Sequence, residues 1–475
     1  MLKKEKEKKS KETKPTEQKW DRIEIRFKNQ DLNSLRRHLL QDLSREYYGC
    51  LLAKRNVIGN FCVITVADAI FPDKGLYHQQ GVSSLRVTGE FLREVLLEVD
   101  KRIDVDTFID VHTHPFAQSD VWFSGTDDRD EENFVEYLTN ESASIYYASI
   151  VFSKTMYEAR YWETDNYGQA ICFPAVIKTQ KLSEAIISSK QEYHGAKDDG
   201  LMQGMFNRSV LALGLENMRK ITGGQHISVV GVGGIGSIIA EHLVHMGFSH
   251  INLIDFDTLE LSNLNRIVGV TYEDAEKERV KVDAVREGLL RINPNADIRA
   301  YNHNVFDKEV ERVLAESDWI MVATDNHASR YHIQELAFRY YVPFITAGVN
   351  ISVKNGIVSD MSGEVILIRI GDRVCLSCLK RLNFNEIAKE IHPDKIVREG
   401  LVRKGYVRGS DVKEPAVKTL NSHLATMAVD VLVNQYTERH RDAIIQVYED
   451  NEFQTIYEDK VSVANRNLEC NVCSI

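Results

Sequence analysis

Hydrophobic residues recur along the chain with two kinds of period. In the first third, apolar runs typical of strands alternate with amphipathic stretches of helical period. We expect the strands at residues 61–66, 107–111 and 144–152, and the helices at residues 32–43, 89–99 and 128–138. From residue 227 onward the order strand, glycine-rich turn, helix, strand repeats, which is typical of a parallel sheet with helices on both faces. The pattern predicts an α/β protein.

At 475 residues the chain is too long for one hydrophobic core. We expect a disordered tail at 1–19, a first domain at 20–165, a linker at 166–200 with a helix at 182–193, and a second domain at 201–475. The lysine-rich tail either keeps the protein in solution or anchors it to an acidic partner.

Charge and hydropathy narrow the class of protein. A net charge of −11 argues against nucleic-acid binding, because that affinity comes largely from Lys and Arg contacts to phosphates. The longest uncharged apolar stretch, 227–240, is interrupted by glycines and is shorter than the roughly 18 residues that span a membrane. We expect a cytoplasmic protein that binds neither nucleic acid nor membrane.

The first set of candidate site residues follows a predicted strand. His112 and His114 are two residues apart, so in an extended chain both point the same way and can bind one metal ion. Asp127 can supply a third ligand, and three ligands with an open fourth position define a catalytic zinc site. Glu46 is the candidate general base and Ser124 the candidate oxyanion donor. The alternative is an ordinary half-buried histidine pair.

The order E-x-x-G-x-L-L, H-T-H-P, S-x-x-D resembles the JAMM metalloproteases over about residues 20–165. The resemblance implies a zinc enzyme that cuts peptide or isopeptide bonds after the C-terminal glycine of ubiquitin-like proteins. Zinc would be bound by His112, His114 and Asp127. The spacing between Pro115 and Ser124 is about one residue longer than the family pattern, which leaves Ser119 and Asp120 as fallback candidates.

The second set lies in the second domain. Gly231, Gly233 and Gly236 form G-x-G-x-x-G between a predicted strand and a helix, where backbone N–H groups can bind phosphate. Asp255 ends the next strand and can hold a ribose hydroxyl. A nicotinamide-dependent dehydrogenase shares this opening. The polar residues that follow instead suit attack at an α-phosphate, which needs cations and a magnesium-binding carboxylate: Asn263, Arg266, Lys281, Asp325 and Arg330.

These blocks resemble the ThiF/MoeB and ubiquitin-activating superfamily over about residues 201–475. The resemblance implies a doubly wound, Rossmann-like adenylation domain that uses ATP and Mg²⁺ to form an acyl-adenylate on the C-terminal glycine of a β-grasp protein. Asp325 would hold magnesium, and Arg208 would be lent across a homodimer interface. The other nucleotide contacts would come from the glycine loop and the polar residues after it: Gly231, Gly233, Gly234, Gly236, Asp255, Asn263, Arg266, Lys281 and Asn326.

Several functions remain open at this point. The leading one is processing and activation of a ubiquitin-like modifier, with a conjugating enzyme as a further partner; the resemblance includes bacterial systems that serve antiviral defence. A second is activation of a sulfur-carrier protein for thiocarboxylate formation. A third is a non-catalytic scaffold that binds ubiquitin-like proteins.

Four of the seven cysteines form two C-x-x-C pairs. The pairs Cys375/Cys378 and Cys470/Cys473 can give tetrahedral sulfur coordination to a structural zinc in a reducing compartment, an arrangement that is familiar in the ThiF/MoeB group. The remaining cysteines are expected in the core (Cys50, Cys62) or near the domain boundary (Cys172). The second domain has no cysteine between the two pairs to serve as a thioester nucleophile, so we expect transfer of the adenylate to a partner's cysteine or to a sulfur donor.

Overall fold

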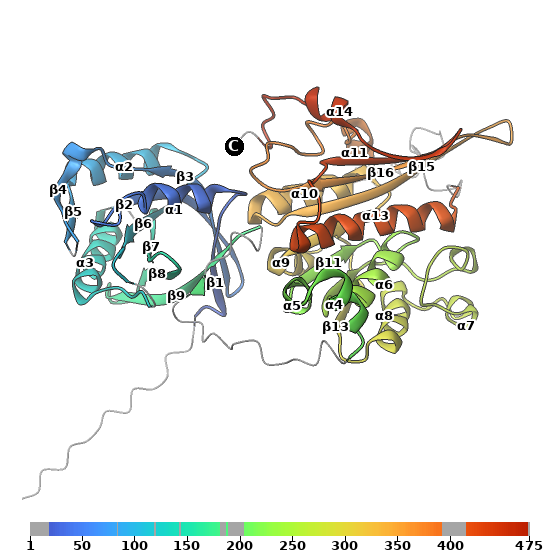
Figure 1. The fold of residues 1–475 in the computed structure, drawn as a ribbon, viewed down its shortest axis with the longest axis horizontal. Helices are drawn as coiled ribbons and strands as arrows, with labels where there is room; N and C mark the ends of the chain where they lie inside the picture. The colour runs from blue at the N-terminus through green and yellow to red at the C-terminus, as the bar shows by residue number, and fades with distance from the viewer. Residues whose placement is uncertain are drawn as a thin grey trace, which may run out of the picture.

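The computed structural model describes residues 19–82, 84–117, 120–141, 144–180, 187–188, 204–391 and 415–473. Apart from residue 19, the expected tail lies outside these residues. The described chain forms an N-terminal and a C-terminal half, each built on its own eight-stranded sheet, and the two halves lie side by side in Figure 1. Within the described residues, no helix has the length and apolar character needed to cross a bilayer.

The N-terminal sheet closes on itself. Its strand order is β10-β8-β7-β6-β2-β3-β1-β9, and β9 pairs with β8 as well as with β1. Its strands are β1 (Arg22–Arg26), β2 (Tyr48–Ile58), β3 (Phe61–Ile70), β6 (Thr107–Thr113), β7 (Tyr146–Phe152), β8 (Met156–Thr164), β9 (Ala170–Lys178) and β10 (Ile187–Ser188). A separate hairpin, three α-helices and a short 3-10 helix complete the described part of this half: β4 (Tyr77–Gln80), β5 (Leu85–Val87), α1 (Asp31–Leu39), α2 (Gly89–Lys101), α3 (Gly125–Glu141) and η1 (Lys74–Leu76).

The C-terminal sheet has a parallel part and an antiparallel part. Its order is β13-β12-β11-β14-β15-β16-β17-β18, parallel from β13 to β15 and antiparallel from β15 to β18. Its strands are β11 (His226–Val230), β12 (His250–Ile254), β13 (Asp297–Tyr301), β14 (Trp319–Val322), β15 (Phe344–Lys354), β16 (Ile357–Ile368), β17 (Ile445–Asp450) and β18 (Gln454–Glu458). This is the Rossmann-like α/β arrangement that the repeated strand–helix order predicted.

Two hydrophobic cores cover the two faces of this sheet. Val229 is buried in one core cluster with Leu243, Val285 and Leu424, whereas Val230 is buried in the other cluster with Val310 and Leu336. Successive residues of one strand thus serve opposite faces, as the two-residue period requires. The helices are α4 (Asn207–Leu213), α5 (Leu215–Thr222), α6 (Gly236–Met246), α7 (Tyr272–Glu276), α8 (Lys281–Ile292), α9 (Lys308–Glu316), α10 (His327–Tyr340), α11 (Phe384–Glu390), α13 (Lys418–Thr437) and α14 (Lys460–Ala464).

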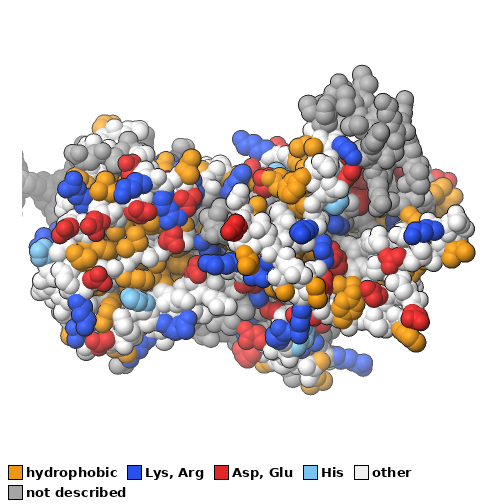
Figure 2. Space-filling model, turned by 90° about the horizontal axis from the view of Figure 1, so that it is seen from above, with side chains coloured by type: hydrophobic (Ala, Val, Ile, Leu, Met, Phe, Trp, Pro, Cys, Tyr) orange, Lys and Arg blue, Asp and Glu red, His pale blue; other side chains and the backbone are white. Residues whose placement is uncertain are grey.

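The two halves share part of one core. Phe61 and Val63 of β3 are buried in the same cluster as Leu336 and Tyr340 of α10. An ion pair spans the same boundary: Nζ of Lys178, in β9, lies 2.7 Å from a carboxylate oxygen of Asp318. Figure 2 shows basic and acidic side chains mixed over both halves on the face seen from above.

The segment expected as a linker at 166–200 contributes to the N-terminal sheet. Its apolar stretch forms β9, which is held between β1 and β8. The helix expected at 182–193 is wrong where the chain is described, because Ile187–Ser188 forms β10 beside β8. Strand pairing with a distant segment outweighs local helical period in so short a stretch. The rest of the expected linker helix lies outside the described residues.

Candidate nucleotide and metal sites

The glycine-rich turn joins β11 to the start of α6. Gly231 has φ of +85°, and a Cβ there would lie 2.8 Å from the carbonyl oxygen of Ala323. A Cβ on Gly236 would overlap the carbonyl oxygen of Gly231. At Gly233, by contrast, a Cβ would meet nothing within 4 Å. Two of these glycines are therefore required by the fold, while the third faces open space at a helix N-terminus, where phosphate binds favourably.

Asp255 anchors the second residue of the turn, Val232. It directly follows β12, and its carboxylate accepts a hydrogen bond from the Val232 backbone N–H at 2.8 Å. Lys281, the first residue of α8, donates to Asp257 at 2.6 Å and lies 3.9 Å from Asp255. Burial raises the pKa of Asp255, and Lys281 opposes that shift. The acidic and basic residues expected around ribose and phosphates thus meet at the end of β12.

Asn263 and Arg266 follow in the next turn. Asn263 is buried and accepts a hydrogen bond from the Glu260 backbone N–H at 3.1 Å. The guanidinium of Arg266 donates to the Ser262 carbonyl at 2.7 Å. The aliphatic stem of Arg266 lies 3.0 Å from where a Gly234 Cβ would be. The side chain of Arg266 therefore packs against the glycine-rich turn.

The third edge of the site is the turn after β14. Ala323 and Thr324 contact Gly231, which brings the exposed Asp325 to the same end of the sheet. Asn326 caps α10 by accepting a hydrogen bond from the Ser329 backbone N–H at 2.8 Å. Oxygen ligands of this kind are the ones that Mg²⁺ prefers. Arg330 donates to the Thr324 carbonyl at 3.0 Å and holds the turn in place.

Arg208 is exposed on α4. A residue lent to a second copy of the chain needs an exposed position, which Arg208 has. Its role at a homodimer interface stays a prediction.

The N-terminal candidate residues converge at the end of β6. His112, His114 and Asp127 each offer a ligand atom, and these atoms lie within 4.8 Å of one another. Nε2 of His112 is buried and has no hydrogen-bond partner among the described residues. Burial lowers the pKa of His112 to about 4 and also lowers the pKa of His114, so both imidazoles are neutral near pH 7, as metal ligands must be. The donor set fits zinc.

Glu46 and Ser124 border this cluster. A Glu46 carboxylate oxygen lies 3.9 Å from His114 Nε2, and burial with the nearby Asp127 raises the pKa of Glu46 to about 7. Ser124 precedes α3, where its hydroxyl accepts from the Asp127 N–H at 3.2 Å and its own N–H donates to Asp127 at 2.6 Å. This reciprocal cap fixes Asp127 toward the histidines. Asp120 is exposed and Ser119 lies outside the described residues.

Asp110, beside this cluster, is a residue that the sequence pattern indicated but that was not among the predicted site residues. Asp110 stands two residues before His112 on the same face of β6, and one of its carboxylate oxygens accepts from the hydroxyl of Tyr48 at 3.2 Å. The other oxygen lies 3.9 Å from His112 Nδ1. The alternation Asp110, His112, His114 in the sequence could have indicated it.

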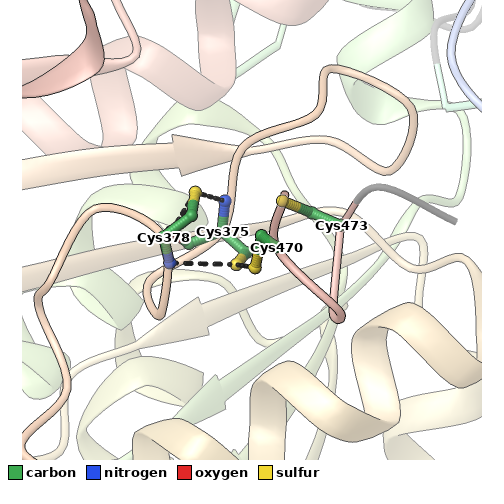
Figure 3. A group of neighbouring side chains, drawn as sticks. All are labelled: Cys375, Cys378, Cys470 and Cys473. Carbon is green, nitrogen blue, oxygen red and sulfur yellow. Dashed lines mark hydrogen bonds between the residues drawn. The ribbon is translucent and has the colours of Figure 1, made fainter. Parts of the chain in front are cut away.

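The four paired cysteines gather in one cluster, shown in Figure 3. Their sulfur atoms lie within 4.8 Å of one another, and those of Cys375 and Cys470 are 3.6 Å apart. Four sulfurs bound at about 2.3 Å to one zinc would be about 3.8 Å apart. Hydrogen bonds from Cys375 and Cys473 lower the pKa of Cys378 to about 3. The cluster could therefore bind zinc. Cys50 and Cys62 are buried as expected, and Cys172 is exposed.

The C-terminal sheet and its glycine turn define a Rossmann-like α/β protein. Residues 206–398 match the sequence model of the ThiF family. Molybdopterin-synthase adenylyltransferase of Escherichia coli (strain K12) is 30% identical over 179 residues, which is 37% of this chain and 68% of that protein. The chain belongs to the ThiF family.

Two other similar proteins match an equal share of this chain. Ubiquitin-like modifier-activating enzyme 5 of Caenorhabditis elegans is 28% identical over 186 residues, 37% of this chain and 41% of that protein. SUMO-activating enzyme subunit 2 of Dictyostelium discoideum is 30% identical over 178 residues, 37% of this chain and 25% of that protein. The chain thus spans less than half the length of these two relatives. The crystal structure of E. coli MccB with ATP is 17% identical with a TM-score of 0.45, covering 58% of this chain and 76% of that one.

Proposed function

We propose that the C-terminal half adenylates the C-terminal carboxylate of a ubiquitin-like or sulfur-carrier β-grasp protein. A carboxylate oxygen attacks the α-phosphorus of ATP, the bond to the pyrophosphate oxygen breaks, and pyrophosphate leaves with the electron pair. The support is the meeting of four polar segments at one glycine turn: Asp255, Arg266 and Lys281 on one side and the Thr324–Asp325 turn on the other. Two similar proteins, an adenylyltransferase and a ubiquitin-like modifier-activating enzyme, have names that agree with this chemistry.

Each group has a defined task in this proposal. The open Gly233 turn and the α6 N-terminus bind phosphate oxygens, Asp255 holds ribose, and Arg266 and Lys281 balance charge that moves to the pyrophosphate. Asn263 and Asn326 complete the nucleotide contacts. Asp325 would bind Mg²⁺, which neutralises phosphate charge when bound. Arg208 would come from the second subunit of a homodimer, and the product would pass to a conjugating enzyme's cysteine or to a sulfur donor.

The test is exchange of labelled pyrophosphate into ATP, with purified β-grasp proteins that end in glycine as substrates. Exchange that depends on such a protein and disappears in Asp325→Ala is expected. Exchange without any carboxylate substrate, or a native rate in Asp325→Ala, would contradict the proposal. A lysine-linked product indicates conjugation, and a thiocarboxylate indicates sulfur transfer.

A second activity is proposed for the N-terminal half: zinc-dependent cleavage after the C-terminal glycine of a ubiquitin-like protein. One observation favours it, namely that His112, His114 and Asp127 converge with a buried, unpaired Nε2 on His112. Zinc would supply a water of lowered pKa when bound. Glu46 would take the proton of that water, and Ser124 would support the oxyanion.

Cleavage of a fusion of a glycine-ended β-grasp protein to a reporter tests this activity. Loss of cleavage in Glu46→Gln, with zinc still bound, is the expected result. Cleavage that persists in Glu46→Gln and after chelation would show that this cluster is not a protease site. A binding scaffold would show neither cleavage nor exchange.

The proposed domain limits are 20–165 and 201–475. Because β9 (Ala170–Lys178) pairs within the N-terminal sheet, it extends the first domain beyond residue 165.

A further inference from the structure

The carboxylate of Asp110, in β6, has one oxygen that is paired and one that is not. Its Oδ2 accepts hydrogen bonds from the hydroxyl groups of Tyr48 at 3.2 Å and Tyr147 at 3.5 Å, and both tyrosines are buried. Its Oδ1 is buried and has no hydrogen-bond partner among the described residues. A buried acceptor without a partner costs free energy. Anchoring the two tyrosines therefore accounts for only one of the two oxygens.

The imidazole of His112 lies between two carboxylates. Asp110 and His112 are two residues apart in β6, so strand geometry places them on the same face of the sheet. Oδ1 of Asp110 lies 3.9 Å from Nδ1 of His112, whereas an oxygen of Asp127 lies 3.8 Å from Nε2 of the same ring. The Nε2 atom is also buried without a hydrogen-bond partner among the described residues. The unpaired oxygen and the unpaired ring nitrogen thus lie on opposite sides of one imidazole.

The chemistry of a neutral imidazole connects these two atoms. One ring nitrogen carries a proton and donates, and the other has the lone pair that can bind a metal. An oxygen that accepts from Nδ1–H therefore selects the tautomer in which Nε2 is free to bind zinc, and it also fixes the orientation of the ring. The observed 3.9 Å exceeds an N–H···O hydrogen bond by about 1 Å. A small rotation of the imidazole would close this distance.

We infer that Asp110 is a positioning residue: its Oδ1 accepts a hydrogen bond from Nδ1–H of His112 and so presents Nε2 of that ring to zinc. This inference rests on the zinc site proposed for the N-terminal half. The hydroxyl groups of Tyr48 and Tyr147 hold Oδ2 and thereby direct Oδ1 toward the ring. Partners of this kind commonly change metal affinity by about 10- to 100-fold, so the loss of Asp110 is measurable in zinc binding.

Competition for zinc with a chromophoric chelator, on the full chain, tests the inference. Asp127→Asn, which removes a proposed ligand, identifies the zinc that belongs to the histidine cluster. Asp110→Ala is expected to weaken the binding of this zinc about tenfold or more. Asp106→Asn removes the same charge at the residue just before β6. It is the matched control and should leave zinc affinity unchanged.

The isosteric variant Asp110→Asn makes the test sharper. Its carbonyl oxygen can keep the hydrogen bonds from Tyr48 and Tyr147, which turns the amide NH₂ group toward Nδ1 of His112. A donor at that position favours the tautomer with the proton on Nε2, which is the wrong one for metal binding. Asp110→Asn is therefore expected to weaken zinc binding at least as much as Asp110→Ala, although it preserves the shape of the side chain.

Proton NMR of the zinc-loaded chain, isotope-labelled at the histidine side chains, gives a readout that a purely structural role for Asp110 would not change. A hydrogen bond to a carboxylate oxygen is short and strong, so it slows the exchange of the imidazole N–H and moves its resonance downfield. We expect one such resonance in the native chain. It should be absent in His112→Gln, and in Asp110→Ala at saturating zinc it should lie upfield of its native position.

The two levels of failure can be told apart. A native chain that binds zinc at the cysteine cluster alone would overturn the proposed N-terminal metal site, and with it the proposed cleavage. Native zinc affinity in both Asp110 variants, or an unchanged imidazole resonance in Asp110→Ala, would overturn only the role of Asp110. Thermal unfolding of each variant without added zinc identifies a folding defect, and if Asp110→Ala is unfolded, Asp110→Asn decides the question.

Discussion

The guanidinium of Arg26, in the N-terminal sheet, donates a hydrogen bond to the backbone carbonyl of Tyr340 at 2.7 Å, in the last turn of α10 in the other half. The same guanidinium donates to the carbonyl of Ala315 at 2.6 Å, near the end of α9. Helix ends leave such carbonyls without intrahelical partners. One buried arginine from β1 therefore caps two helices of the ThiF-family half.

Replacing Arg26 should destabilise the whole protein. Arg26→Ala removes both caps and leaves Glu24, which is fully buried and accepts from Arg26 at 2.7 Å, without this partner. Breaking a buried pair in this way typically costs about 3–5 kcal/mol. Urea unfolding measures the loss. Arg312→Ala, which breaks a more exposed ion pair with Asp21 across the same boundary, should cost less than about 1 kcal/mol; equal costs for the two variants would refute a special role for Arg26.

The same boundary should weaken in acid. Burial raises the pKa of Glu24, but Arg26 and other cations more than offset this, so the net pKa is lowered; for Asp318, Lys178 likewise outweighs burial. Lowered carboxyl pKa values add stability that is complete above the unfolded value of about 4 and is lost as pH falls through the folded value. We expect the urea midpoint to fall more steeply below pH 4 in the native chain than in Asp318→Asn. Parallel pH profiles would contradict this.

Substitution of two glycines of the turn should separate an effect on folding from an effect on ATP binding. Gly236→Ala must displace the Gly231 backbone and should lower both the unfolding temperature and ATP affinity. Gly233→Ala meets no neighbour, so its unfolding temperature should be native. If phosphates pass over this residue, Gly233→Ala will still weaken ATP binding. Native ATP affinity in Gly233→Ala would show that the open side of the turn is not used.

Zinc content should distinguish the two candidate metal sites. We expect two zinc ions per chain by mass spectrometry of the native protein, one held by the four cysteines and one by the histidine cluster. Asp127→Asn should retain only the zinc of the four cysteines, and Cys375→Ser should retain only that of the histidine cluster and unfold at a lower temperature. Exposed Asp120 and Cys172 supply the matched controls, Asp120→Asn and Cys172→Ser. Two zinc ions in Asp127→Asn would rule out the N-terminal site.

Local pattern was enough to predict much of this protein. The strand at 107–111 and the helix at 89–99 lie within β6 and α2, and the G-x-G-x-x-G turn lies between strand and helix as expected. These features depend on residues close in sequence, whose period and conformational needs are visible in the chain itself. The candidate residues His112, His114 and Asp127 also come together, because strand geometry places the two histidines on one side.

Contacts between distant segments could not be predicted in this way. β9 was expected in a linker because its role depends on pairing with β1 and β8. Arg26 reads as an ordinary strand residue until the ends of α9 and α10 are placed against it. Asn421 has no motif around it, and only the approach of α13 to Gly234 brings it beside the glycine turn. Nothing in a single sequence specifies which segments will meet.

The cysteine cluster can be completed only late in the synthesis of the chain. Cys375 and Cys470 are 95 residues apart, so while the chain is being made the ribosome releases the first pair well before the second. Until Cys473 has emerged, the first pair is a two-thiol fragment that holds metal weakly and is open to oxidation. If zinc binds these cysteines, the ThiF-family half should acquire its full stability only after translation has passed that residue, and should depend on zinc and reducing conditions at a late stage of synthesis.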